Sequence, residues 1–343
     1  MRKLAFIAFS ICATSVGAQD IHFSQTTQTP LFINPAAAGV YDGWERVILN
    51  HRNQWLGSGT QFMTSAVAFD ANIGKTRRSE TPYLGVSALF FNDIGGDSKF
   101  GQQTGSIGLS GVIPMAGTGH LVSAGIQGSF SNRSADYSRL LFSSQWTGTA
   151  FDPNLLTGEQ NGANFQYADV AGGLFYTFDA GGTNFRRREE LKIQAGVSGF
   201  HLNKPTMKFA GVEGDRLNRK WIMHASVVAD IPGSPIAIDG NVMQVFQGPH
   251  TETVLGAIAR YRLINGTHYT GYSQAAYIGL GAYYRVGDAI CPAFVIDMYG
   301  FKFGISYDYT ISSMRKAYTG GSLEFSLSYT NLSHALFKWK GRR

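Results

Sequence analysis

The feature that most constrains this chain is the alternation of apolar and polar residues near its C-terminal end. In residues 300–311, and again in 321–330, almost every second side chain is apolar, and a basic, glycine-bearing segment joins the two runs. The apolar positions are Phe301, Phe303, Ile305, Tyr307, Tyr309, Ile311, Leu323, Phe325, Leu327 and Tyr329. Because alternate side chains of a strand point to opposite faces, the pattern predicts two antiparallel strands with one apolar and one polar face.

The polar face indicates which solvent the sheet meets. It carries three ionisable residues, Lys302, Asp308 and Glu324. In the core of a soluble sandwich each would cost several kcal/mol unless paired, whereas a wet lumen accepts them readily. Charged residues make up only 15% of the chain, well below the ~25% of a typical soluble domain. We therefore expect the apolar face to contact lipid and the polar face to point inward.

Runs of this kind recur along the chain and predict fourteen strands, most about ten residues long, the length a tilted strand needs to cross a bilayer. They are 44–50, 61–70, 82–92, 102–113, 119–131, 166–178, 191–201, 220–230, 235–247, 251–262, 274–285, 288–298, 300–311 and 321–330. No later segment has 18 consecutive apolar residues, so no helical span is expected. In lipid every backbone group must be paired, so the first and last strands should meet and close a transmembrane antiparallel β-barrel.

The start of the chain has the order of a secretory signal peptide. A basic Arg2-Lys3 precedes an almost wholly apolar stretch, and small residues follow at 16–18. We expect residues 1–18 to be removed; a lipoprotein signal at Cys12 is a minor alternative. Loss of Arg2 and Lys3 lowers the net charge from +6 to +4, spread along the chain, which does not suggest a nucleic-acid partner.

The remaining chain divides into an N-terminal segment (19–43), the barrel (44–330) and a basic tail (331–343). The N-terminal segment carries Pro30, Pro35 and Gly39 and does not alternate, so it is predicted not to be a strand. Fourteen strands lie between the filled eight-stranded barrel and the open porin, so something is expected to occupy the lumen. This segment could do so, and so could a long loop; a loose periplasmic leader fits it equally well.

An even strand count places both termini on one side, which we assign to the periplasm of an outer-membrane protein. The connections at 114–118 and 231–234 then become periplasmic turns, and 179–190 a solvated periplasmic link. The long segments 132–165 and 202–219 fall on the outer side, where such loops are usually functional.

Catalytic motifs are missing from the sequence. Gly74-Lys75-Thr76 lacks the glycine that a phosphate-binding loop needs, because Phe69 stands there. No serine lies in a nucleophile elbow, and the eight histidines show no metal-ligand spacing. We expect a non-enzymatic protein with no cofactor. An outer-membrane lipid hydrolase with a Ser-His pair brought together by the fold is the minor alternative.

Several short motifs together resemble a known family. HFSQTTQTPLFINPAAAGVYDG (22–43), followed by VILNHRNQW (47–55), is similar to the start of the PorP/SprF family of type IX secretion outer-membrane proteins. FHLNKP (200–205), YYRVGDAICPAF (283–294) and residues 299–329 resemble later parts of the family, so the likeness covers about 20–330. Lys316-Ala317 and the basic tail depart from the family pattern and leave partner specificity open.

The resemblance implies a barrel that supports type IX secretion, or surface attachment of a large secreted adhesin, in some bacteria for gliding motility. Expected partners are the adhesin's C-terminal domain or periplasmic ring or peptidoglycan-binding components, besides outer-membrane lipid. The residues of the resembling motifs are the candidate partner-binding site: Phe23, Ser24, Gln25, Asn34, Pro35, Arg52, Asn53, Gln54 and Trp55. Purely structural roles are the alternative for these residues: Trp55 could be an aromatic residue at the membrane–water interface, and Asn34-Pro35 could simply form a turn. A general or solute-specific porin is the alternative function.

Overall fold

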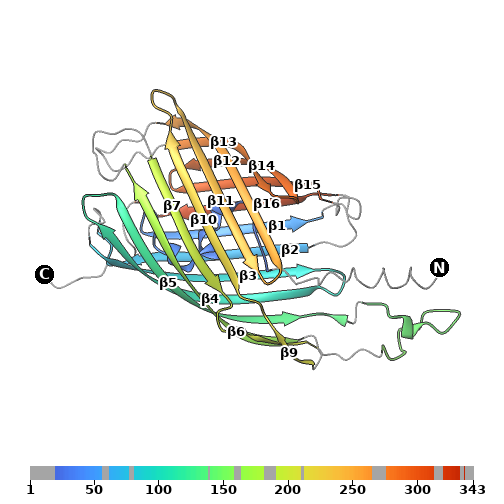
Figure 1. Ribbon diagram of the computed structural model, residues 1–343. Coiled ribbons are helices and arrows are strands. Elements are labelled where there is room, and N and C mark those ends of the chain that lie inside the picture. The colour runs from blue at the N-terminus through green and yellow to red at the C-terminus, as the bar shows by residue number, and fades with distance from the viewer. Residues whose placement is uncertain are drawn as a thin grey trace, which may run out of the picture.

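The computed structural model describes residues 20–55, 62–76, 81–137, 140–157, 164–180, 191–209, 212–264, 276–312, 320–332 and 336. Fourteen antiparallel strands form a closed barrel (Figure 1). The barrel strands are β1 (Glu45–Gln54), β2 (Phe62–Ile73), β3 (Tyr83–Gly95), β4 (Phe100–Met115), β5 (His120–Ser134), β6 (Phe165–Asp179), β7 (Leu191–Phe200), β10 (Lys220–Asp230), β11 (Ile236–Gln247), β12 (His250–Ile264), β13 (Ala276–Arg285), β14 (Ala289–Met298), β15 (Phe301–Thr310) and β16 (Ser322–Thr330). The predicted number of barrel strands is confirmed.

Closure is achieved as predicted by pairing of β1 with β16, in a register that runs from Arg46 opposite Thr330 to Asn53 opposite Leu323. Two short strands were not predicted. β8 (Thr206–Phe209) and β9 (Val212–Arg216) form a separate two-stranded sheet between β7 and β10. At four and five residues they are too short to show the alternation that marks the barrel strands.

The two faces of the wall differ as expected. Outward side chains such as Leu49, Phe90 and Leu327 are exposed, whereas inward ones such as Asp308 and Glu324 are buried. A continuous exposed apolar surface of this kind is typical of a membrane-facing protein. Across the part of the chain that the structure describes, no helix is long and apolar enough to cross a bilayer.

We call the end of the barrel where β1 begins and β16 ends the proximal end, and the opposite end the distal end. At the proximal end Asn331 N donates to Glu45 O at 2.8 Å. The long connections 132–165 and 202–219 share the distal end, as predicted, and the turns after β4 and β10 lie at the proximal end. Short connections also occur distally, after β3, β11 and β13, so loop length alone does not distinguish the two ends.

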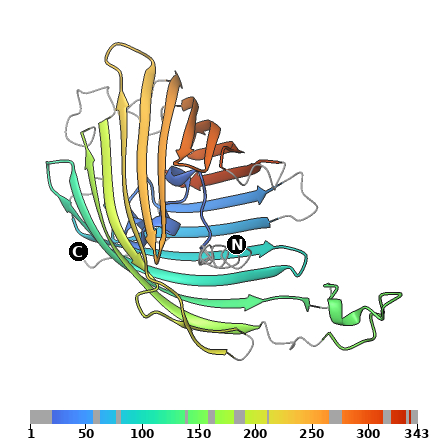
Figure 2. The same cartoon turned by 45° about the vertical axis from the view of Figure 1, so that its right-hand side comes forward.

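The segment that precedes β1 folds into the lumen, where Figure 2 shows it as the dark-blue coil inside the strands. Residues 20–43, which we call the plug, contain η1 (Thr26–Gln28), the single-turn α2 (Pro30–Ile33) and η2 (Pro35–Ala37). Pro30 and Pro35 occupy first-turn positions, where the missing N–H costs nothing. In the structure this segment therefore occupies the lumen of the barrel and is not a loose leader.

The plug places the first and last described residues at opposite ends of the barrel, which the expectation of two termini on one side did not foresee. Asp20 lies at the distal end, hydrogen-bonded to His201 just beyond β7, whereas Leu336 lies proximally, beside Glu45. The strand count omitted this extra passage through the lumen. The predicted signal peptide, most of the link 179–190 and most of the basic tail lie outside the described residues.

Candidate functional site

A carboxylate clamp holds the plug near the distal end of the barrel. Glu324 of β16 accepts hydrogen bonds from two consecutive backbone N–H groups, Ser24 N at 2.7 Å and Gln25 N at 3.0 Å. The Ser24 hydroxyl donates to Asp308 of β15 at 2.9 Å. Glu324 and Asp308 are buried, and hydrogen bonds to a carboxylate are among the stronger ones in proteins. The two carboxylates among the three ionisable residues of the C-terminal alternating strands therefore fasten a segment about 300 residues away.

Arg52 completes this clamp. Its guanidinium lies 2.9 Å from Asp308 Oδ2 and donates to His22 O at 2.7 Å, and Arg285 of β13 reaches the same carboxylate at 3.2 Å. Arg52 is only 1% exposed, and a buried charge of this kind is tolerated only when it is paired and hydrogen-bonded. The Gln25 amide adds hydrogen bonds with the hydroxyls of Ser306 and Ser326.

Asn34 fixes the middle of the plug. Its Oδ1 accepts from Ala36 N at 2.9 Å and caps η2, while its Nδ2 donates to Leu174 O of β6 at 2.9 Å. Wall hydroxyls meet the carbonyls on either side: Ser198 donates to Ile33 O, Ser123 to Ala36 O and Ser110 to Ala38 O, at 2.5–2.8 Å. Buried backbone carbonyls that lack a ladder partner are satisfied in this way.

Glycines in the wall let the plug approach the strands. A Cβ added at Gly125 of β5 would lie 2.6 Å from Ala36 N, and one at Gly85 of β3 would lie 2.3 Å from Ala38 O. At Gly173 it would lie 2.1 Å from the Asn34 Oδ1. A side chain at these positions would overlap the plug. The high glycine content, 42 of 343 residues, is thus partly a requirement for packing a segment against the inner wall.

The proximal end of the plug is fastened by Asp70 of β2. Its Oδ2 accepts from Gly39 N at 3.1 Å and pairs with Arg46 at 2.8 Å. Lys75 Nζ donates to the carbonyl oxygens of Tyr41 and Gly43, at 2.6 and 3.1 Å. Fixed at both ends and in the middle, the plug is an integral part of the folded barrel.

The structure brings together most of the nine residues predicted as a partner site, but around the plug. Phe23 is buried against Phe32, with ring centroids 5.7 Å apart. Pro35 is buried at the start of η2. With its amide oxygen turned toward Arg52, Gln54 accepts from Nη2 at 2.9 Å. Contact of these residues with a partner remains a prediction; their observed contacts are within the barrel.

Asn53 and Trp55 are not part of this arrangement. Asn53 alternates with the inward Arg52 and so lies on the outward face of β1. Trp55 directly follows β1 with a positive φ of 57°, and its ring packs edge-on against Phe62 at 4.6 Å. The structure therefore separates these two residues of the motif from the plug clamp.

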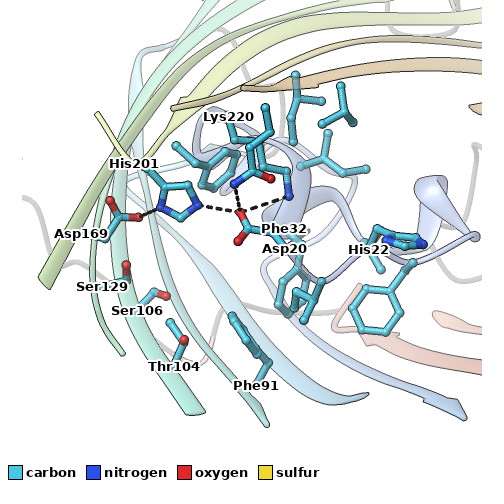
Figure 3. A pocket seen from close by; sticks show the side chains of 18 of the residues that line it. Asp20, His22, Phe32, Phe91, Thr104, Ser106, Ser129, Asp169, His201 and Lys220 are labelled. Atoms are coloured by element: carbon cyan, nitrogen blue, oxygen red, sulfur yellow. Dashed lines mark hydrogen bonds and ion pairs between the residues drawn. The ribbon is translucent and has the colours of Figure 1, made fainter. Parts of the chain in front are cut away.

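A second fastening, which sequence reasoning missed, lies at the distal tip of the plug (Figure 3). His201 lies between Asp20 and Asp169 of β6, with nitrogen–oxygen distances of 2.6 and 2.8 Å. Lys220 and Gln247 also contact Asp20. Burial alone would lower the pKa of His201, but its hydrogen bonds to the two carboxylates raise it to about 9. Only the family-like FHLNKP step marked His201 in the sequence.

This arrangement predicts that the distal tip loosens at high pH. The folded pKa of His201 lies above its ordinary value of 6.5, so its stabilisation is complete below about pH 6.5 and disappears as pH rises through about 9. The difference between these two pKa values of His201 corresponds to a stabilisation of roughly 3 kcal/mol. Limited proteolysis near Asp20 should therefore accelerate between pH 6 and pH 9.5. In His201→Asn, chosen because asparagine tolerates the local φ of 56°, cleavage should be fast and independent of pH. Equal rates at both pH values in the wild type would contradict the prediction.

A cavity of about 100 Å³ lies beside this fastening, between the plug and the wall. Phe23, Phe32 and residues of β10 and β11 line one side, and polar side chains of β4, β5 and β6 line the other. Figure 3 shows Asp169, Ser129, Ser106 and Thr104 following one another along that polar side.

Beyond the strands, residues 140–157 project at the distal end, at the right of Figure 1. The segment has internal structure: η4 (Ser143–Gln145) is followed by a bridge between Trp146 and Phe151. It also exposes large apolar side chains, including Leu141 (77%), Trp146 (57%) and Leu156 (89%). Exposed large apolar side chains on one short segment make it a candidate protein-binding surface.

The described residues offer little support for catalysis. A Ser-His hydrogen bond does occur between His51 Nδ1 and Ser65 Oγ at 2.9 Å, on the exposed face of β1 and β2. However, no third group in the described part of the chain hydrogen-bonds to this imidazole, as a catalytic triad requires. Within the same ranges no cluster of three metal-ligating side chains occurs, and Cys291 is buried and unbridged.

Comparison with known proteins identifies one matching family. Its sequence profile, described as type IX secretion system membrane protein PorP/SprF, matches residues 15–329. No curated protein sequence matches the chain significantly.

Solved structures similar to this chain include a deletion mutant of the TodX monoaromatic hydrocarbon channel, at 10% identity and a TM-score of 0.46, covering 89% of this chain and 94% of that one. The beta domain of the Bordetella autotransporter Brka has 9% identity and a TM-score of 0.42, covering 84% of this chain and 100% of that one. CdiB from Acinetobacter baumannii has 6% identity and a TM-score of 0.41, covering 84% and 60%.

Proposed function

The chain belongs to the PorP/SprF family of type IX secretion system membrane proteins, and from this premise we propose that it is a plugged, non-conducting barrel that holds a secreted substrate at its distal end. It is a type IX secretion-related β-barrel of the outer membrane. The proposal concerns the role within that system, namely attachment or export of a substrate such as a large adhesin, with gliding as one setting.

The observation that carries this proposal is the plug. A solute channel needs a continuous aqueous path, whereas here residues 20–43 cross the lumen and are hydrogen-bonded to opposite parts of the wall. Removing the plug would break the buried pair of Asp20 with His201 and the hydrogen bonds that Glu324 and Asp308 accept from Ser24 and Gln25. Hydrogen bonds to charged groups contribute about 1.5–3 kcal/mol each. A permanently filled barrel suits a scaffold better than a porin.

We assign the proximal end to the periplasm and the distal end to the outside. The long connections and the apolar loop 140–157 lie distally, where bacterial barrels usually carry their larger loops. In this orientation a secreted substrate meets the loop, and periplasmic ring or peptidoglycan-binding components meet the proximal end. Seven of the nine motif residues, all but Asn53 and Trp55, then act indirectly, because they belong to the plug or hold it in place at the distal end of the barrel.

Electrical recording tests the proposal against the porin alternative. The purified protein should give no resolvable steps in a planar lipid bilayer at moderate voltage, because the plug is fastened along its whole length. Steady, voltage-independent steps from the wild type would reject the scaffold and support the porin. A porin of known conductance, prepared in the same detergent, controls for successful insertion.

The apolar loop should determine substrate capture. Replacing Leu141 and Leu156 with aspartate puts charges on two of the most exposed apolar side chains, without touching the barrel. Each buried leucine contributes about 1.5–3 kcal/mol, so capture of secreted proteins from native membranes should fall at least about tenfold. Mass spectrometry of tagged pull-downs measures this. Leu263→Asp and Ile264→Asp, at the proximal end of β12, serve as the matched control. Unchanged capture would place the substrate elsewhere.

A further inference from the structure

The distal cavity has the chemistry of a binding site. We propose that it takes one primary ammonium group on an aliphatic stem, presented as a lysine side chain of the bound polypeptide. The proposal deepens the function proposed above and rests on it for the source of the lysine. The cavity itself can be tested without any partner.

Four neighbouring side chains of the polar wall of the cavity are Ser106, Gln127, Ser129 and Asp169. Ser106 pairs with Ser129 across β4 and β5, and Ser129 with Asp169 across β5 and β6, so the three form a continuous inward row. Gln127 lies diagonally next to Asp169, an arrangement that puts side chains about 7–8 Å apart. All four side chains line the cavity. They form a compact patch of acceptors on three neighbouring strands.

Two acceptor atoms of this wall lack a hydrogen-bond donor. Gln127 Oε1 and Asp169 Oδ1 accept no hydrogen bond from the described residues, although the side chains are only 8% and 5% exposed. Asp169 uses its other oxygen for His201. Leaving a buried acceptor without a donor is unfavourable, so a group that supplies donors is stabilised here.

The opposite wall of the cavity is apolar and suits the aliphatic stem of the proposed lysine side chain. It is built from Phe23 and Phe32 of the plug and from Ile222, Met243 and Val245 of β10 and β11. Lysine combines an apolar four-carbon stem with a terminal group that has three donors and no acceptor. The cavity, at about 100 Å³, is smaller than the ~150 Å³ engineered cavity that binds benzene, which favours a linear side chain over a ring.

The charges around the cavity allow such a group. Asp20 and Asp169 are balanced by Lys220 and His201, and Glu252 of β12 adds a further carboxylate whose Oε1 has no donor among the described residues. These lining side chains therefore carry a net negative charge. An entering carboxylate would be repelled, whereas an ammonium would be attracted.

The site can be tested with n-butylamine, which reproduces the lysine stem and is protonated at pH 7. We expect it to bind the purified full-length protein in detergent, measured by saturation-transfer NMR, more tightly than n-butanol of the same length. Gln127→Leu removes one acceptor and should weaken binding about tenfold, and Gln127→Glu should tighten it. Thr177→Val is the matched control, because Thr177 is another buried residue of the inner wall with an unpaired hydroxyl, but does not line the cavity.

Each outcome discriminates. Equal affinity for butanol and butylamine, or unchanged affinity in Gln127→Leu, would overturn the ammonium site. If butylamine binds as expected but acetylating the lysines of secreted proteins leaves their capture by the tagged barrel unchanged, the site takes a free small amine and the partner lysine is rejected. If the loop variants keep full capture while butylamine still binds, the proposed docking surface fails and the cavity site survives.

Discussion

Deleting residues 21–38 is expected to convert a silent barrel into a conducting one. The deletion removes the segment that fills the lumen but leaves the wall pairs of Asp308 with Arg52 and Arg285 intact, because neither pair involves the plug. The emptied fourteen-stranded lumen then falls between the filled eight-stranded barrels and the water-filled sixteen-stranded porins. Bilayer recordings should change from no resolvable steps to steady ones, the largest functional change any variant in this chain should give.

The control for this experiment is deletion of residues 144–156 in the distal loop, which should stay silent because the lumen is untouched. Folding of both variants is checked by the heat-dependent gel shift of intact barrels. Silence of a correctly folded plug deletion would mean that another segment closes the lumen, and the role given to residues 20–43 would be wrong.

A single methyl group at Gly125 should destabilise the barrel strongly. The Cβ of Gly125→Ala would lie 2.6 Å from Ala36 N and 2.7 Å from Ala36 Cα, and these are backbone atoms of a plug fixed on both sides. Overpacking of this kind typically costs 1–3 kcal/mol, and we expect about 3 kcal/mol because no flexible side chain can give way. Urea unfolding of the protein in lipid vesicles measures the change.

Gly128→Ala is the matched control on the same strand. Gly128 faces outward, and an added Cβ meets no atom within 4 Å. The same substitution there should be neutral within about 0.5 kcal/mol, as at surface sites generally. Equal losses at both positions would mean that strand propensity, and not contact with the plug, sets the cost of replacing these glycines.

The barrel could be predicted because its signals are local. Each strand alternates over about ten residues, and Lys302, Asp308 and Glu324 on one face indicate a polar interior. The expected solvent is replaced at Asp308 and Glu324 by the plug, which buries both carboxylates. Closure follows from the need to pair every backbone group in lipid, and β1 does pair with β16. The strand ends differ from the predicted ones by a few residues. Several strands, such as β4 and β5, extend beyond the residues whose alternation predicted them.

The site could be predicted only in part, because its contacts are distant in sequence. The motif residues Ser24, Gln25 and Arg52 were predicted as one partner-binding group, and the structure does bring them together, but nothing local shows that Glu324 and Asp308 are the residues they contact. The fastening of Asp20 by His201 and Asp169 was missed for the same reason. Neither histidine spacing nor alternation carries information about a contact that spans 181 residues.

The clamp can hold the plug only after the last strand of the barrel is in place. Ser24 and Gln25 are among the first described residues, and their acceptor, Glu324, lies in the last strand. A chain that ends before β16 has neither a partner for β1 nor a carboxylate for these two N–H groups. These contacts close one of the largest loops in the chain and carry a high loop-closure entropy, so we expect them to form late. A nascent or truncated barrel should thus keep a loose N-terminal segment open to periplasmic proteases, and sealing of the lumen would coincide with arrival of the final strand.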